Sequence, residues 1–233
     1  MIKPTLRTLF EFNYTKYPAR IFDMRIDAMS QLLAYANIRS HNKVIVVDGI
    51  HGLLTAAVAE RVGENGFIIN FHSTEGACEE PMRQLNLPQK TLDLVWHVPW
   101  SKLNLDFDAE KKKLQEIPQD TLTTFQLKRK LRQLDRIQEA LSTLSTTKFD
   151  SLIVASEHDP EIILRNMLPL LAPSRQFSIF SQYLEPLSKC FIELKQSNTA
   201  INISLTESWY RPYQVLFILT RKKKKERKKR KYL

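Results

Sequence analysis

A regular alternation of short β-branched runs with amphipathic segments constrains the fold of this chain most strongly. Five short apolar runs predict buried strands, over 43–47, 67–71, 92–98, 151–155 and 177–181. Segments with helical spacing lie next to these runs, over 25–36, 53–62, 77–85, 160–171 and 184–195. Strands that alternate with helices predict a mostly parallel, doubly wound α/β sheet with helices on both faces.

Two more apolar runs follow near the carboxyl end, over 200–205 and 213–219. Only a short link joins them, whereas neighbouring parallel strands need a long crossover. We therefore expect an antiparallel pair at the edge of the sheet. A doubly wound sheet that ends in such a pair resembles the Rossmann-like sheet of class I methyltransferases.

The middle of the chain, about 106–148, is charged and interrupts the alternation. Within it, 128–144 predicts a basic helix with a narrow apolar stripe of Leu131, Leu134, Ile137, Leu141 and Leu144. This segment is expected to be a helical insertion in a single domain over 23–219. A lead-in segment, 1–22, precedes that domain, and a polybasic tail, 220–233, follows it.

The net charge of +10 is concentrated in that tail. Residues 221–231 contain ten Lys and Arg and one Glu, and the other residues contain 25 basic and 24 acidic side chains. A run of this kind is typically disordered and binds phosphate non-specifically or directs nuclear import. The overall basicity therefore does not indicate nucleic-acid binding by the folded part.

Composition and spacing exclude other classes of protein. No apolar stretch is long enough for a transmembrane helix, and the first twelve residues lack the apolar core of a signal peptide. Cys78 and Cys190 are expected to be free thiols in a reducing compartment. The five histidines show no metal-ligand spacing, so we expect no metal site.

The turn after the first predicted strand decides whether a nucleotide-type cofactor could bind. A working loop is rich in glycine, because its backbone approaches the ligand closely. Here the turn reads Asp48, Gly49, Ile50, His51, Gly52, and the Ile50 and His51 side chains would fill space that a cofactor needs. The next strand, 67–71, runs into His72 and Ser73 and offers no acid for ribose hydroxyls. We interpret the loop as degenerate; the alternative is an unusual but working loop that starts at Asp48-Gly49.

Stretches in order along almost the whole chain resemble one protein family. They cover 3–7, 17–18, 24–33, 36–39, 43–47, 52–54, 59–63, 151–156, 171–175, 182–187 and 205–216. The most specific is the last, Leu-Thr-Glu-Ser-Trp-Tyr-Arg-Pro-Tyr-Gln-Val-Leu. These residues are similar to the non-catalytic subunit of the tRNA methyltransferase that makes 1-methyladenosine at position 58.

The resemblance implies a role without catalysis. In that family the subunit pairs with a homologous catalytic subunit in a two-plus-two heterotetramer in the nucleus, and only the partner holds S-adenosylmethionine. Family members also carry an N-terminal β-barrel domain, and this chain is expected to begin at or after its end. After Leu216 the family pattern continues with Pro, an Arg-containing loop and His-Pro, whereas here 217–220 lead into the polybasic run.

The resemblance and the chemistry of phosphate binding together suggest residues that contact tRNA. The basic helix offers Lys128, Arg129 and Arg132. The regions that match the family's tRNA-facing surface add Lys195, Gln196, Asn198, Asn202, Gln214, Val215 and Leu216. Two weaker candidates, Arg7 and Arg25, lie in the matched N-terminal stretch. For each basic residue the competing interpretation is a solvated charge.

Three functions remain open at this point. The first is a binding and assembly subunit of a tRNA methyltransferase. The second is an active S-adenosylmethionine-dependent RNA methyltransferase with a divergent loop. The third is a non-enzymatic protein that binds RNA through its tail alone.

Overall fold

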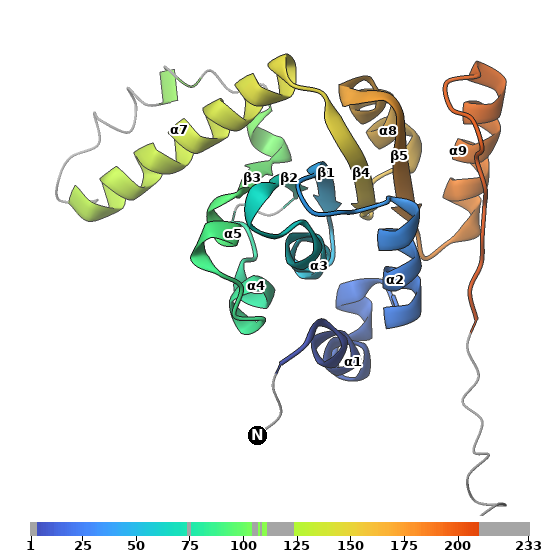
Figure 1. The fold of residues 1–233 in the computed structure, drawn as a ribbon, viewed down its shortest axis with the longest axis horizontal. Coiled ribbons are helices and arrows are strands. Elements are labelled where there is room, and N and C mark those ends of the chain that lie inside the picture. Colours follow the sequence, from blue (N-terminus) through green and yellow to red (C-terminus); the bar gives the residue numbers. More distant parts are fainter. Residues whose placement is uncertain (1–3, 74–75, 104–106, 108, 111–123, 210–233) are drawn as a thin grey trace, which may run out of the picture.

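The computed structural model describes residues 4–73, 76–103, 107, 109–110 and 124–209. Its centre is a five-stranded, all-parallel sheet in the order β3-β2-β1-β4-β5 (Figure 1). The strands are β1 (Lys43–Asp48), β2 (Phe67–His72), β3 (Val95–Pro99), β4 (Phe149–Ala155) and β5 (Leu171–Phe180). β1 lies in the middle and pairs with both β2 and β4. The prediction of a doubly wound α/β sheet is confirmed.

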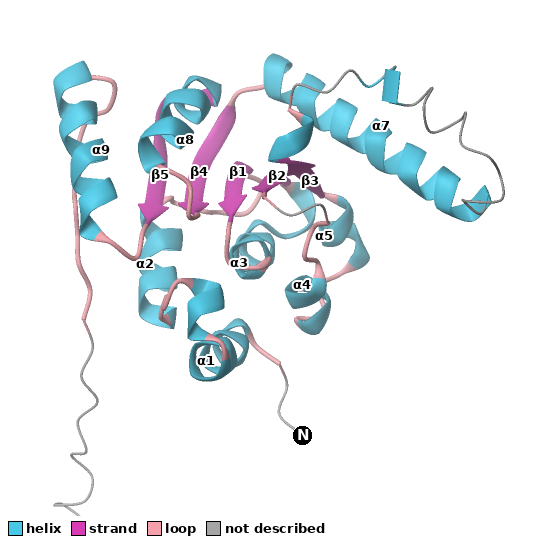
Figure 2. Ribbon diagram, turned by 180° about the vertical axis from the view of Figure 1, so that it is seen from behind, coloured by secondary structure: helices cyan, strands magenta, loops and turns pink. Residues whose placement is uncertain are grey.

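Helices cover both faces of the sheet (Figure 2). Each face has its own apolar core. One face carries α1 (Leu6–Lys16), α2 (Ile26–Tyr35), α3 (Leu53–Val62), α4 (Glu80–Gln84) and α5 (Gln89–Asp93). The other carries α7 (Thr124–Thr146), α8 (Pro160–Met167) and α9 (Leu184–Ser197). Because it is covered on both sides, β1 is buried over all but its first residue, which explains its uninterrupted apolar sequence.

Short 3-10 turns connect these elements. They are η1 (Pro18–Ile21), η2 (Gly63–Asn65), η3 (Trp100–Lys102) and η4 (Leu168–Leu170). Two of them follow a helix directly, which is where such turns commonly occur.

The lead-in segment contains a helix that packs on the body of the domain. Thr5 caps α1 in a reciprocal pair of hydrogen bonds with Thr8, and this capping box begins the helix. Phe10, on the inner face of α1, is buried in the core shared with α2 and α3. The lead-in segment thus contributes side chains to the same core as the elements that follow it.

The basic segment forms a long helix, as predicted. Leu134, Ile137, Ala140 and Leu144 are buried against the sheet, while Leu131 and Leu141 are half-buried. The amino-terminal half of α7 projects beyond the sheet in Figure 1. The apolar stripe thus anchors the carboxyl-terminal half of α7 and leaves its basic half exposed.

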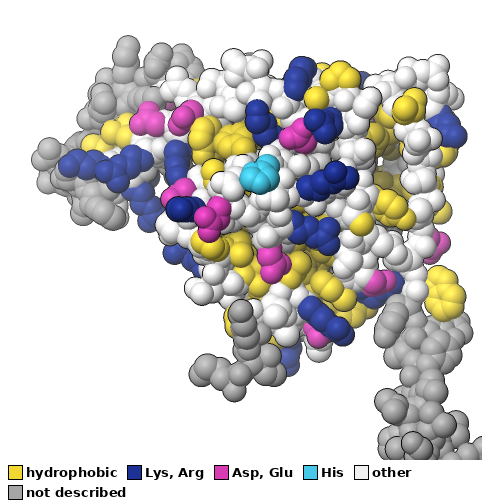
Figure 3. All heavy atoms as spheres, in the orientation of Figure 1, with side chains coloured by type: hydrophobic (Ala, Val, Ile, Leu, Met, Phe, Trp, Pro, Cys, Tyr) yellow, Lys and Arg dark blue, Asp and Glu magenta, His cyan; other side chains and the backbone are white. Residues whose placement is uncertain are grey.

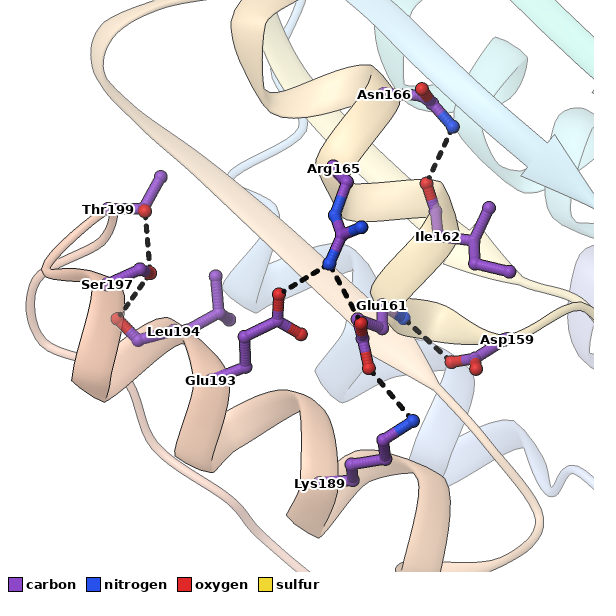
Figure 4. A network of polar contacts seen from close by, with 10 residues as sticks. All are labelled: Asp159, Glu161, Ile162, Arg165, Asn166, Lys189, Glu193, Leu194, Ser197 and Thr199. Atoms are coloured by element: carbon purple, nitrogen blue, oxygen red, sulfur yellow. Dashed lines mark hydrogen bonds and ion pairs between the residues drawn. The ribbon is translucent and has the colours of Figure 1, made fainter.

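Charged side chains join α8 to α9 (Figure 4). Arg165 donates to Glu161 on its own helix and to Glu193 on α9, both at 3.0 Å. Lys189 of α9 reaches the other carboxylate oxygen of Glu161 at 3.0 Å. Arg165 and Lys189 are more than two-thirds exposed, so this network orients α9 and adds little to stability.

Of the two strands predicted near the carboxyl end, the first is wrong and the second stays a prediction. Residues 200–205 form no strand: Ile201 and Asn202 lie in a bend, Asn202 has a left-handed backbone at φ 54°, and no backbone hydrogen bond joins the segment to β5 among the described residues. Residues 213–219 lie outside the described residues. The described sheet is therefore wholly parallel, and the expected antiparallel pair is not seen in it.

The described part of the chain has no helix long and apolar enough to span a bilayer. Within the same residues, no three His, Cys, Asp or Glu side chains gather as metal ligands would. Cys78 is a half-buried free thiol and Cys190 a buried one.

Candidate cofactor loop and basic helix

Asp48, the last residue of β1, organises the turn where a cofactor would bind. One carboxylate oxygen accepts from the backbone N–H groups of Ile50 at 2.8 Å and Gly52 at 3.2 Å. The other accepts from the N–H of Thr55 at 2.9 Å and from its hydroxyl at 2.7 Å. The carboxylate is buried, and it satisfies free donors at the amino end of α3. A ligand anion would need those donors.

The two side chains predicted to fill the loop behave differently. Ile50 is fully buried and belongs to the core beneath α2 and α3. His51 is exposed, with a left-handed backbone at φ 55°. Ile50 therefore takes up interior space at the turn, whereas the filling of cofactor space by the exposed His51 side chain stays a prediction.

The two glycines of the turn allow other segments of the protein to pack closely against its backbone. A Cβ on Gly52, which has φ +82°, would lie 2.1 Å from the carbonyl oxygen of Cys78. A Cβ on Gly49 would lie 3.0 Å from the carbonyl oxygen of Ala155 and 3.1 Å from the Phe22 ring. Backbone from the β2–α4 connection and from the end of β4 thus occupies the sides of the turn.

The ends of β2 and β3 present imidazoles. The Asn70 amide lies 3.1 Å from Nδ1 of His97, and the His72 and His97 rings are 6.1 Å apart. Burial lowers the pKa of His97 to about 4, so its ring is neutral at physiological pH. Beyond them, Ser73 shares a 2.9 Å hydrogen bond with His158, linking the end of β2 to the residues after β4.

Two features of this edge argue against a place for S-adenosylmethionine. The donors at the start of α3 are already bonded to Asp48, and the protein's own backbone fills the sides of the turn. Residues 67–73 contain no carboxylate that could accept from ribose hydroxyls, and Glu75 lies outside the described residues.

The basic half of α7 carries three of the predicted tRNA contacts. Lys128, Arg129 and Arg132 are exposed, and none of the three makes an ion pair or side-chain hydrogen bond among the described residues. Basic side chains gather at the projecting end of α7 in Figure 3. Unpaired cations on a projecting helix are suited to contact a phosphate backbone.

The other predicted contacts lie elsewhere on the molecule. Arg7 pairs with Glu11 on α1 at 2.7 Å. Arg25 is half-buried: two hydrogen bonds to Asp27, at 2.9 and 2.8 Å, raise its pKa, and a third reaches the carbonyl of Ser208 at 3.1 Å. These bonds fix Arg25 in the structure and make it a poor candidate for phosphate contact.

A third group lies at and after the end of α9, which lies beyond the β5 edge of the sheet, whereas the α7 tip lies beyond the β3 edge (Figure 1). Lys195 and Gln196 are exposed in the last turn of that helix, and Lys195 lies over the Phe191 ring at 5.1 Å. Asn198 ends the helix with a left-handed backbone, and Asn202 is exposed. Gln214, Val215 and Leu216 lie outside the described residues. The structure therefore separates the candidates into three groups.

The role of Asp48 as internal acceptor was not apparent from the sequence. In the sequence Asp48 is one residue of a glycine-poor turn, and the pattern does not show that its carboxylate bonds the loop. The residue that could have indicated this role is Thr55, near the start of α3. The helix has Gly52 as its N-cap, which offers no side-chain acceptor, so its first N–H groups need an acceptor from elsewhere.

Comparison with known proteins places this geometry in a family. A family model described as the Gcd10p family matches residues 1–130, more than half of the chain. The chain belongs to the Gcd10p family. The match covers α1, the degenerate turn after β1 and the first three strands.

Two relatives cover nearly all of the chain. The tRNA (adenine(58)-N(1))-methyltransferase non-catalytic subunit of Mus musculus is 29% identical over 93% of this chain and 56% of its own length. The subunit of the same name in Dictyostelium discoideum is 27% identical over 93% of this chain and 46% of its own length. The chain thus spans about half the length of the curated relatives it matches.

A solved structure supports the fold. The SAM-dependent O-methyltransferase from Thermotoga maritima superimposes with a TM-score of 0.58 at 14% identity, over 91% of this chain and 63% of that protein. The sheet therefore has a Rossmann-like fold. At this identity the likeness concerns the fold alone.

Proposed function

We propose that this chain is a non-catalytic, substrate-binding and assembly subunit of the tRNA methyltransferase that forms 1-methyladenosine at position 58. The names of its relatives support the enzyme and the subunit type. The observation that carries the non-catalytic role is the Asp48 carboxylate, bonded to three backbone N–H groups and one hydroxyl of the turn. An active methyltransferase would need that turn for its cofactor.

In this proposal S-adenosylmethionine binds in a homologous catalytic subunit, and none binds here. The two kinds of subunit assemble as two plus two in the nucleus and act on tRNA. The subunit names of the relatives support a catalytic partner. The stoichiometry and the location follow from the family resemblance alone.

The proposed tRNA contact is made first by the tip of α7. Lys128, Arg129 and Arg132 project there without acidic partners among the described residues, whereas Arg7 and Arg25 already have theirs. Phosphate contacts add affinity and salt dependence without sequence selectivity. Recognition of the T-loop would depend on folded shape and on the partner.

Co-expression with a candidate catalytic subunit tests the proposal. We expect the two chains to purify together and to methylate tRNA, whereas neither chain alone is active. Failure to co-purify, or methylation by this chain alone, contradicts the proposal.

Charge reversal on α7 tests the RNA contact. The triple variant Lys128→Glu, Arg129→Glu, Arg132→Glu should bind tRNA more weakly in that complex. The logarithm of the tRNA association constant falls linearly with the logarithm of the salt concentration. The magnitude of this slope should decrease by roughly 2 to 3, about 0.7 to 0.9 for each lost phosphate contact. The matched control reverses Lys16, Arg61 and Lys43, which are exposed elsewhere on the domain. Equal salt slopes for the two triple variants would contradict a contact between α7 and tRNA.

A further inference from the structure

Two exposed aromatic side chains and a cation form a surface patch at the end of α1. Phe12 is 55% exposed and Tyr17 is 49% exposed. Their ring centroids lie 6.3 Å apart in an edge-to-face arrangement. The guanidinium carbon of Arg20, in η1, lies 5.5 Å from the centroid of the Tyr17 ring. We call these three side chains the aromatic patch.

The local sequence explains why the two rings lie outside the core. Phe12 follows the buried Phe10 by two residues, which places it about 200° further around the helix and away from the core. Tyr17 ends α1, because Pro18 disfavours a helical backbone at the residue before it and begins η1. The turn at this point sets the Tyr17 ring against Phe12 and Arg20.

The aromatic patch lies towards the carboxyl edge of the sheet. Figures 1 and 2 place α1 beyond the carboxyl ends of the strands. Phe22, which follows η1, reaches the degenerate turn, where its ring lies 3.1 Å from a Cβ built on Gly49. Burial raises the pKa of the Cys78 thiol, and the positive charge of Arg20 opposes that shift, so Arg20 faces the β2–α4 connection. Open α/β sheets bind their ligands outside this edge.

The charge of the patch suits a nucleotide. Arg20 is exposed and has no acidic partner among the described residues, whereas Arg7 of α1 pairs with Glu11. Unpaired RNA bases stack on aromatic rings and on guanidinium planes, and a guanidinium also binds phosphate. Two half-exposed rings beside an unpaired guanidinium therefore offer the groups that bind an unpaired nucleotide.

We propose that Phe12 and Tyr17 stack against an unpaired base of the RNA substrate, with Arg20 at the phosphate of the same nucleotide. This inference rests on the proposed function, because the substrate is the same tRNA. It adds a base contact to the phosphate contacts proposed for α7. Phosphate contacts do not distinguish paired from unpaired bases, whereas stacking needs an unpaired one.

A protein partner fits the aromatic patch less well than a base does. Stable protein interfaces use roughly 20 to 30 residues on each side, around an apolar centre. Here the exposed neighbours on α1 are polar: Glu11, Thr15 and Lys16. A base needs only one or two rings to stack on.

Binding of two RNA probes to the complex of the full chain with its catalytic partner tests the proposal. One probe is a folded tRNA transcript, and the other is a fully paired RNA duplex of similar length. We expect Tyr17→Ala and Phe12→Ala to weaken tRNA binding by about fivefold or more, the effect of losing stacking on one base, without a change in the salt slope. The duplex should bind both variants within about twofold of wild type, because its bases are paired.

Further variants separate stacking from other roles of the side chain. Tyr17→Phe keeps the ring and should bind tRNA like wild type. Tyr17→Leu keeps an apolar side chain without a ring and should bind tRNA like Tyr17→Ala. Arg20→Gln should decrease the magnitude of the salt slope by about 0.7, one phosphate contact on a single strand. Tyr35→Ala is the matched control, because Tyr35 is a 53% exposed tyrosine on α2.

Tyr17→Ala and Phe12→Ala that bind tRNA as tightly as Tyr35→Ala overturn the proposal. So does an equal loss on the tRNA and on the duplex, or wild-type affinity in Tyr17→Leu, because the contact is then not a ring on an unpaired base. Loss of co-purification in Tyr17→Ala also overturns it, since the patch is then a protein interface. If Tyr17→Ala fails to fold, Phe12→Ala decides.

The same measurements distinguish this proposal from the proposed function. A wild-type complex that does not bind tRNA contradicts the proposed function and this contact with it. A complex that binds tRNA equally well with and without the two rings contradicts this contact alone.

Discussion

Replacing Asp48 by Asn tests whether its carboxylate organises the degenerate turn. Asn keeps the size of the side chain and one acceptor oxygen, so the bonds from Ile50 and Gly52 can persist. The second oxygen becomes an NH2 group that faces the Thr55 N–H and hydroxyl. The hydroxyl can rotate to accept, but the N–H loses its acceptor.

The expected loss follows from those bonds. One buried N–H without a partner costs about 1 to 3 kcal/mol in the free energy of unfolding. Asp48→Ala leaves three backbone donors without the carboxylate, and its loss should be larger, about 3 to 5 kcal/mol. Thr55→Val removes only the hydroxyl bond and should cost about 1 kcal/mol. The loss in the free energy of unfolding should therefore be largest for Asp48→Ala, smaller for Asp48→Asn and smallest for Thr55→Val.

Urea denaturation followed by circular dichroism measures these losses. Combining Asp48→Ala with Thr55→Val should lose less than the sum of the single variants, because both remove the bond between the Asp48 carboxylate and the Thr55 hydroxyl. A loss under about 0.5 kcal/mol for Asp48→Asn, within the range of ordinary surface substitutions, would refute the internal-acceptor argument.

Two further predictions concern backbone approach and pH. Gly52→Ala should lower the melting temperature more than Gly63→Ala, although both glycines have positive φ. A Cβ at Gly52 would lie 2.1 Å from the Cys78 carbonyl oxygen, whereas a Cβ at Gly63 would have no atom within 4 Å. The Gly63 variant should cost about 1 kcal/mol, roughly 2 to 4 °C in melting temperature, and equal losses in the two variants would contradict the close approach to Cys78. The pKa of His97 is lowered from 6.5 to about 4, so the unfolded chain takes up a proton first as pH falls. Wild type should therefore lose stability relative to His97→Gln by about 1.4 kcal/mol per pH unit between those values, and a pH-independent difference in urea denaturation would show that the ring is not held neutral.

Sequence alone was sufficient for the central elements. The β-branched run at 43–47 and the apolar runs at 67–71 and 151–155 match β1, β2 and β4 closely, since strands buried on both faces have little freedom in composition. Helix α3 was predicted to the residue, because Gly52 and Gly63 bound it.

Elements whose form depends on distant contacts were missed or misplaced. The strand predicted from Leu92 begins only at Val95, because Gln89–Asp93 forms the short helix α5. β5 begins at Leu171, before an irregular stretch with Ser174 at φ 60°, and becomes regular at Gln176, near the predicted start. Helix α1 was not predicted: the burial of Phe10 depends on α2 and α3, which no local pattern reveals.

For the candidate site, sequence could identify residues that are missing but not those that replace them. The lost glycines and the acid-free end of the second strand were visible in the sequence. The capture of the turn's N–H groups by Asp48 required coordinates, because it depends on how the chain folds back over seven residues. Likewise, the exposed cations of α7 could be predicted, whereas the pairing of Arg25 with Ser208, 183 positions away, could not.

Calorimetric titration of S-adenosylmethionine into the purified chain tests the central claim most directly, with the catalytic partner alone as the positive control. A turn already filled by Asp48 and by the protein's own backbone should give no binding up to millimolar cofactor, while the partner binds. Saturable micromolar binding by this chain alone would contradict the account.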